Sequence, residues 1–271
     1  MNTLALKLIL APALIGAASL AGRRWGPAIS GSLVGLPLTS APVVFILALS
    51  QGIPFAAATT LGILAGAISP ALFALAYAWV ARQRAWPAAL LAGLAIYIPV
   101  TAALRAALVA WPPSPIPLFL LVVVVLAVAL RLMPTASAPA SDTASTKSAA
   151  APAWDLPARM GVATVFVFLL TSAASTLGPE LTGLLSPFPL YASILAIFAH
   201  QQQGSGAAIT VLRGLLLGMF SFTSFFLTLS LLLQPAGIAL TFAAAAIVAL
   251  ALQAGALWLL RRPRRSARQA D

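Results

Sequence analysis

Few side chains in this 271-residue chain could do chemistry at a catalytic or ion-binding centre. The sequence holds four acidic residues, one histidine and no cysteine. Without cysteine it can form no disulfide, thiolate metal site or cysteine nucleophile. It also lacks the zinc-protease H-E-x-x-H, the phosphate-binding P-loop and a pair of intramembrane aspartates. The sequence therefore predicts neither an enzyme nor a bound cofactor or metal ion.

His200, in HQQQGSG, is the single histidine. A serine nucleophile that used it as a base would need a third, orienting group, and no acid lies near it in the sequence. One histidine without a nearby carboxylate makes no metal site. Its predicted place at a helix C-terminus, where positive charge stabilises the negative end of the helix, explains it sufficiently.

Glu180, Arg105 and Arg213 are the remaining candidates, because they fall in or near apolar segments. Burying an unpaired ionisable group in a membrane costs several kcal/mol, so such residues are often functional. We interpret Glu180 as a coupling or gating carboxylate near the outer face, within reach of Arg105. The alternative is a solvated loop glutamate beside a helix N-terminus. Arg213 either binds an anion in a cavity or extends its side chain to the headgroups.

The composition indicates which elements must hold these residues. Hydrophobic residues make up 62% of the chain, and only 7% are charged. Apolar runs of about 18 or more residues recur along most of its length. The net charge of +11 comes from basic residues at the ends of these runs, which is not a nucleic-acid-binding pattern. We predict an all-α, polytopic membrane helical bundle that is surrounded by the lipid bilayer.

Dividing the apolar runs at Pro, Gly, polar and charged positions predicts about nine transmembrane helices. These spans form a first four-helix repeat (1–111), a connecting transmembrane helix (112–133) and a second four-helix repeat (157–261). A disordered cytoplasmic linker (134–156) and a basic cytoplasmic tail (262–271) complete the chain. The predicted spans are 4–21, 33–50, 54–80, 86–110, 116–133, 158–177, 186–200, 206–233 and 236–260.

Lys and Arg set the orientation, because they collect on the cytoplasmic side of membrane proteins. Placing Arg23 and Arg24 inside puts the N-terminus outside and the C-terminus in the cytoplasm. Twelve of the fifteen basic residues then fit, and the exceptions are Lys7, Arg105 and Arg213. A cleaved signal peptide is the alternative for 4–21, but the two arginines that follow it act as a stop signal.

A glycine- and proline-rich stretch occurs twice, as GPAISGSLVGLPL at 26–38 and GPELTGLLSPFPL at 178–190, an offset of 152 residues. At this offset, fifteen of the fifty positions 26–75 are identical to their counterparts, including Gly, Pro and Gln residues. An odd span separates the two units, so the second should be inverted relative to the first. Inverted repeats recur in secondary transporters.

The repeated motif has the composition of a broken helix beside a substrate path. Proline removes a donor and frees a carbonyl, glycine allows close backbone approach, and Ser or Thr can cap the next helix. The alternative is an interfacial turn, just as Gly62 with Gly66 and Gly214 with Gly218 are typical of helix packing. The predicted path for a small solute or ion comprises Gly26, Pro27, Ser30, Gly31, Pro37, Gly178, Pro179, Glu180, Thr182, Gly183, Pro189, Arg105 and Arg213.

The second half also resembles a known family. In LTGLLSPFPLYASILAIFAHQQQG and LLLGMFSFTSFFLTLSLLL, a glycine enters an apolar span, a Phe-Pro pair lies within it, and a Gly-Met-aromatic helix follows. These features resemble the GlpM family of small inner-membrane proteins, which look like a single four-helix unit. The resemblance covers 157–260 and, through the repeat, 7–110, although the first half lacks the Phe-Pro pair. It implies a multi-pass protein of the cell inner (plasma) membrane, and some members are linked to bacterial exopolysaccharide production.

Two functions follow from these patterns. The first is a transporter-like protein that moves a small solute or ion through the repeat interface. The second is a non-transporting component that supports envelope or exopolysaccharide assembly through lateral helix contacts. Water-accessible positions at Ser30, Thr182 or Glu180 would favour the first, and a dry interior the second. The sequence identifies neither the solute nor the oligomeric state, and a homo-oligomer is one of the alternatives.

Overall fold

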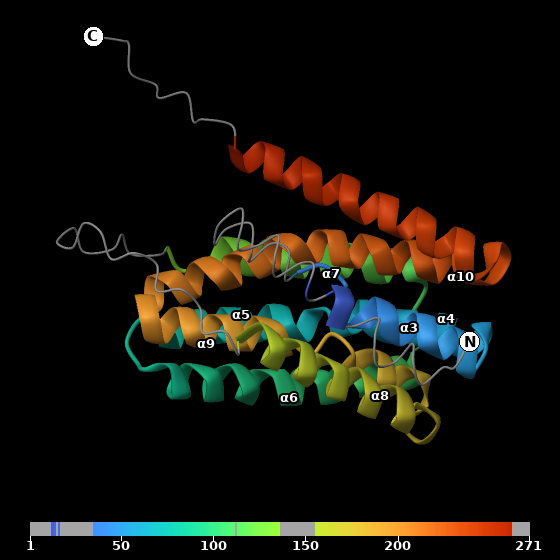
Figure 1. Ribbon diagram of the computed structural model, residues 1–271, viewed down its shortest axis with the longest axis horizontal. Coiled ribbons are helices and arrows are strands. Elements are labelled where there is room, and N and C mark those ends of the chain that lie inside the picture. The colour runs from blue at the N-terminus through green and yellow to red at the C-terminus, as the bar shows by residue number, and fades with distance from the viewer. Residues whose placement is uncertain (1–11, 15, 17–34, 112, 136–154, 262–271) are drawn as a thin grey trace, which may run out of the picture.

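The computed structural model describes residues 12–14, 16, 35–111, 113–135 and 155–261 (Figure 1). These residues form helices and no strand, which agrees with the all-α prediction. Five described helical segments are long and apolar enough to cross a membrane. The elements are α3 (Ser40–Ser50), α4 (Ile53–Gly66), α5 (Ile68–Ala81), α6 (Trp86–Ala110), α7 (Pro115–Leu132), α8 (Asp155–Leu185), α9 (Leu190–Gln203) and α10 (Ser205–Arg261).

Helices α4 and α5 form the centre of the bundle, and more of this segment is buried than of any other described candidate span. The predicted span 54–80 agrees within one residue with the candidate membrane span Ile53–Ala81. Within this span the structure separates two helices at Ala67, which the sequence did not predict. Pro70 has no N–H to donate to the carbonyl of Gly66, so the helical ladder is interrupted here. The Ala67 N–H is shared between the carbonyls of Ile63 and Leu64, at 3.1 and 3.3 Å.

Helices α6 and α7 lie at the periphery and match their predicted bounds of 86–110 and 116–133 within one residue. Both are mainly apolar and continue without a break, although α6 contains a proline and an arginine. Their outward-facing side chains include Leu91, Ile98, Leu120 and Val124, all more than half exposed. Large apolar side chains on an outer surface are expected where the surrounding medium is lipid.

Helices α8 and α10 each contain a sharp break at a glycine with positive φ, Gly178 at 78° and Gly237 at 72°. The described apolar segment of α10 spans 51 residues. At about 1.5 Å per residue it is more than twice as long as the roughly 30 Å hydrocarbon core. Gly237 folds it into two antiparallel arms, and Figure 1 shows the second, red arm turning back. The predicted separation of 206–233 from 236–260 agrees with this break.

Helices α3 and α9 are shorter than predicted. The predicted spans 33–50 and 186–200 were wrong at their starts, because α3 begins at Ser40 and α9 at Leu190. Residues 35–39 and 186–189 are turns instead. Each turn contains proline, which restricts the preceding residue to extended conformations and removes a helix donor.

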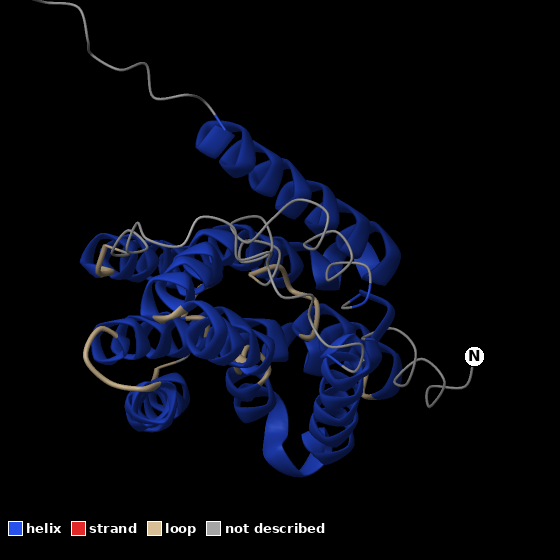
Figure 2. Cartoon of the chain, turned by 60° about the vertical axis from the view of Figure 1, so that its left-hand side comes forward, coloured by secondary structure: helices blue, strands red, loops and turns tan. Residues whose placement is uncertain are grey.

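Segments that are 152 residues apart run in opposite directions in the bundle. In Figure 1, α4 and α5 run from right to left, whereas the first arm of α10 runs from left to right. Helix α6 runs from left to right, and the second arm of α10 runs back. Helices α3 and α9 both start in the middle and run to opposite ends. Figure 2 shows the second arm of α10 at the edge of the bundle.

Most of the predicted span 4–21, the first copy of the motif up to residue 34, most of the linker 134–156 and the tail 262–271 lie outside the described residues. Where the linker ends, α8 already begins at Asp155, three residues before the predicted start.

Candidate functional site

Two turns with the same hydrogen-bonding pattern, 35–39 before α3 and 186–189 before α9, lie in the middle of the bundle, and we call them the breaks. Before α3, the N–H of Leu38 donates to the carbonyl of Leu36 at 2.7 Å. Before α9, the N–H of Leu190 donates to the carbonyl of Phe188 at 2.8 Å. Both the donors and the acceptors are 152 residues apart. The breaks are therefore equivalent turns, although SPFP in one replaces VGLP in the other.

The breaks are joined directly to each other. The hydroxyl of Ser40, in the first turn of α3, donates to the carbonyl of Ser186 at 3.0 Å, and both residues are buried. This bond connects residues that are 146 positions apart in the sequence. It satisfies a carbonyl at the end of the short helical segment of α8, where intrahelical donors run out.

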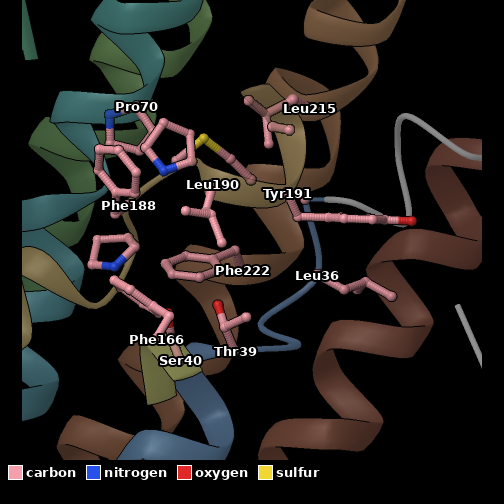
Figure 3. A pocket seen from close by; sticks show the side chains of 15 residues that line it. Leu36, Thr39, Ser40, Pro70, Phe166, Phe188, Leu190, Tyr191, Leu215 and Phe222 are labelled. Carbon is pink, nitrogen blue, oxygen red and sulfur yellow. The ribbon is translucent and has the colours of Figure 1, made fainter. Parts of the chain in front are cut away.

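A cavity of about 50 Å³ lies between the two breaks (Figure 3). It has room for roughly three water molecules. Ten of its lining residues form five pairs at the offset of 152 residues, so the cavity lies where the two halves of the chain meet. The pairs are Gly35 with Pro187, Leu36 with Phe188, Thr39 with Tyr191, Ser40 with Ala192, and Pro70 with Phe222.

Two helix N-termini contribute polar backbone groups to the cavity, beside the hydroxyl-bearing residues Thr39, Ser40 and Tyr191. Thr39 immediately precedes α3 and Pro189 immediately precedes α9, and both residues line the cavity. Both helices run outward from the cavity (Figure 1). Two helix N-termini thus present their positive ends toward the same space. Such an arrangement suits a polar or negatively charged group better than a bare cation.

Aromatic rings close the cavity on the side of α6 and α8. Phe188 packs edge-to-face on Tyr97 with ring centroids 5.1 Å apart, and Phe166 lies 6.3 Å from Phe188. Phe166 and Phe188 line the cavity, whereas Tyr97 lines a second, open groove of about 770 Å³. The contact between Tyr97 and Phe188 is therefore the wall between the cavity and the groove.

Close glycine contacts hold the breaks against the central helices. A Cβ added to Gly66 would lie 2.9 Å from Cγ of Pro187, and one added to Gly35 would lie 2.5 Å from Cα of Gly218. At the offset of 152 residues, Gly66 corresponds to Gly218 and Gly35 corresponds to Pro187. The contact of Gly66 with Pro187 is therefore equivalent to the contact of Gly218 with Gly35. No larger side chain fits at either glycine without movement of the neighbouring helix.

Of the first copy of the predicted motif, Gly26, Pro27, Ser30 and Gly31 lie outside the described residues. Pro37 is buried in the turn before α3.

The second copy is described completely. Gly178 forms the kink of α8, and Pro179 begins the short helical segment after it. Thr182 is buried, and its hydroxyl has no hydrogen-bond partner among the described residues. Gly183 packs against the backbone of Thr59 and Gly62 in α4. Pro189 lines the cavity; of the nine predicted site residues that the structure describes, it is the one that does so.

The predicted charged residues are not brought together. Glu180 is exposed and forms no salt bridge with Arg105, which is exposed in the open groove beside α6. Arg213 is exposed on the first arm of α10 and lines neither space. The ring nitrogen Nδ1 of His200 lies 3.4 Å from the hydroxyl of Tyr77, so α9 contacts α5 through this pair.

The sequence missed most of the cavity wall. Phe166 and Phe222 belong to apolar helical runs, and nothing in those runs distinguishes a ring at a cavity from a ring in a helix interface. Extending the first copy of the motif by two residues, to Ser40, would have included Thr39 and Ser40 in the predicted site. Interpreting SPFP as a turn would have included Pro187. The groove at Arg105 had no sequence signal besides the position of the arginine itself.

No family model, no curated protein and no solved structure matches the chain.

Proposed function

We propose that the protein is a multi-pass transporter that moves a small solute or ion across the membrane through the cavity between the two helix breaks. The single observation that carries this proposal is the composition of the cavity wall, in which five residue pairs separated by 152 positions surround one space. Paired broken helices at the midplane, with helix ends directed at a common site, are the usual construction of a transporter substrate site.

We further propose that 1–111 and 157–261 are inverted repeats connected by α7. The opposite directions of corresponding helices support this arrangement (Figure 1). So do two buried hydrogen bonds, from Thr101 to Ser69 at 2.9 Å and from Ser221 to Gln253 at 3.1 Å, which connect corresponding positions. Alternating access then consists of movement of one repeat against the other around the cavity.

In the proposed orientation the protein spans the inner membrane, with its N-terminus outside and its C-terminus in the cytoplasm. Arg82 and Arg84 follow α5, and Arg131 is in the last turn of α7, at the same end of the bundle (Figure 1). Trp79 adds an interfacial anchor there, because its indole N–H donates to the carbonyl of Leu132 at 3.0 Å and Arg82 stacks on its ring. The resemblance to the GlpM family points to the same membrane.

The test uses the absence of cysteine. Thr39→Cys and Tyr191→Cys, a pair at corresponding positions of the cavity wall, are each treated in intact cells and in inside-out vesicles with a membrane-impermeant thiol reagent. We expect both to react from at least one side, because a transporting cavity opens to water. Val44→Cys and Ala196→Cys are the matched controls, since both positions are fully buried, lie outside the cavity and are also 152 residues apart.

If the cavity positions are as unreactive as the controls from both sides, the interior is dry and the transport proposal fails. The second function, a membrane component that supports envelope or exopolysaccharide assembly, would then be favoured. If the positions react, uptake by proteoliposomes that contain the purified full-length chain is the assay with which a solute is identified.

A further inference from the structure

The groove beside Arg105 is an open space much larger than the central cavity. Its volume of about 770 Å³ falls in the range of sites that hold a ligand of drug size. One wall is α6 and the other is the short helical segment at the end of α8. The walls are mainly aliphatic and consist of Ile98, Ala102, Ala106, Val109, Leu181 and Leu185.

Arg105 places a positive charge at this aliphatic groove, and no acidic residue in the described part of the chain pairs with it. It is exposed, and it makes no salt bridge with Glu180, the acidic residue next to the groove residue Leu181. An anion in the groove would pair with this arginine, because an unpaired charge beside aliphatic side chains is costly. The guanidinium binds phosphate through two parallel hydrogen bonds.

The position of Arg105 in the bundle also requires an explanation. It lies near the C-terminal end of α6, opposite the end at which Arg82, Arg84 and Arg131 collect (Figure 1). Among the described residues, no other Lys or Arg lies at this end. Topology signals favour basic residues at one side of the membrane only, so an isolated arginine at the other side is not explained by orientation.

The deep end of the groove is polar and touches the wall of the central cavity. Thr101, which donates to Ser69, and Tyr97 lie there, and the ring of Tyr97 contacts Phe188. A molecule that fills the groove would therefore be polar at Arg105 and apolar along α6, and it would press on the Tyr97 and Phe188 wall. These properties are those of a membrane lipid with a charged headgroup.

We propose that this groove is a binding site for one anionic phospholipid, with its phosphate at Arg105 and an acyl chain along α6 and the Leu181 to Leu185 segment. The site is distinct from the central cavity. It does not depend on the proposed transport, since it requires only that the chain lies in a bilayer.

The experiment measures lipid retention on the purified full-length protein in detergent by native mass spectrometry. The probes are phosphatidylglycerol and phosphatidylcholine with identical acyl chains. We expect one phosphatidylglycerol to be retained at concentrations at which phosphatidylcholine is lost. Arg105→Gln should weaken this retention roughly five- to tenfold, the effect of one arginine near a lipid phosphate. The matched control is Arg213→Gln, because Arg213 is also an exposed arginine within a helix.

A second variant keeps the charge and fills the space. Ala102 is exposed in the groove, so Ala102→Trp should fold and still exclude the acyl chain. We expect it to reduce phosphatidylglycerol binding while Arg213→Gln leaves it unchanged. Equal retention of the two lipids by the unsubstituted protein would overturn the proposal. Undiminished phosphatidylglycerol binding by Arg105→Gln, or an equal loss in Arg213→Gln, would do the same.

Discussion

In the first half, Thr101 donates to Ser69 across 32 residues, and in the second half Ser221 donates to Gln253 across the same separation. The turns before α3 and α9 agree as closely, and so do Gly52 and Gly204, with φ values of 91° and 85°. The two halves therefore share the geometry of these turns and a helix-to-helix hydrogen bond at corresponding positions.

Several ionisable side chains occur in only one of the two halves. Tyr77 and His200 are in contact at one end of the bundle, whereas the corresponding residues are Leu229 and Ala48. Arg105 corresponds to Leu257, which removes the charge at that position in the second half. Residues that the backbone requires occur twice, and residues that could carry chemistry occur once. The two ends of such a bundle therefore differ in their ionisable side chains, although the turns near its centre have the same backbone geometry.

The largest effect should come from filling the glycine contacts that pack the breaks. Gly35→Val and Gly66→Val should each destabilise the protein by about 3 kcal/mol or more, because overpacking here displaces backbone or proline rather than a flexible side chain. Thermal unfolding in detergent measures the effect. Gly161→Val is the control, since nothing lies within 4 Å of a Cβ there. A small effect at only one of the two contacts would show that the breaks are not packed equivalently.

The next effect should come from the turns at Gly52 and Gly204. Both have positive φ with ψ near 180°, a region that glycine alone occupies readily, so Gly52→Ala and Gly204→Ala should each cost about 1 to 3 kcal/mol. Space is not limiting, because an added Cβ meets nothing closer than 3.8 Å at Gly52 and nothing within 4 Å at Gly204. Unfolding measurements should give equal losses, and clearly unequal losses would contradict the equivalence of the two turns.

The smallest effect should come from the buried hydrogen bonds. Double-mutant cycles with Ser69→Ala and Thr101→Val, and with Ser221→Ala and Gln253→Leu, should each give a coupling of about 0.6 kcal/mol, the average for such bonds in membranes. Similar couplings in both cycles would sharpen the comparison. A coupling in one cycle alone would mean that the second bond contributes little to stability.

How far the sequence predicted the fold depends on what kind of signal each element carries. Helices α6 and α7 are long, mainly apolar segments with polar or proline-rich residues at their ends, and their bounds were confirmed within one residue. The starts of α3 and α9 were predicted too early in the sequence. Residues such as Leu36 and Phe188 continue the apolar run, and hydropathy alone does not detect a turn in the backbone. The break between α4 and α5 was missed, since Pro70 interrupts the ladder four residues before its own position.

The candidate site was predicted in part for the same reason. The repeat identified Pro37 and Pro189 because proline and glycine restrict the backbone locally, and local restrictions can be read from the sequence. The cavity itself arises from Phe166, Pro70 and Phe222, which meet only after helices that are distant in the sequence have packed. A pairing of Glu180 with Arg105 remained geometrically reasonable from the sequence, but the structure keeps them apart.

The bond from Ser40 to Ser186 also has a consequence for biosynthesis. The ribosome makes the turn before α3 long before it makes Ser186, and at about 5 to 20 residues per second the delay is roughly 7 to 30 s. During this interval the Ser40 hydroxyl lacks the carbonyl of Ser186 as its acceptor. Synthesis of this chain therefore passes through a half-made state in which the first turn has not yet met the segment that packs against it.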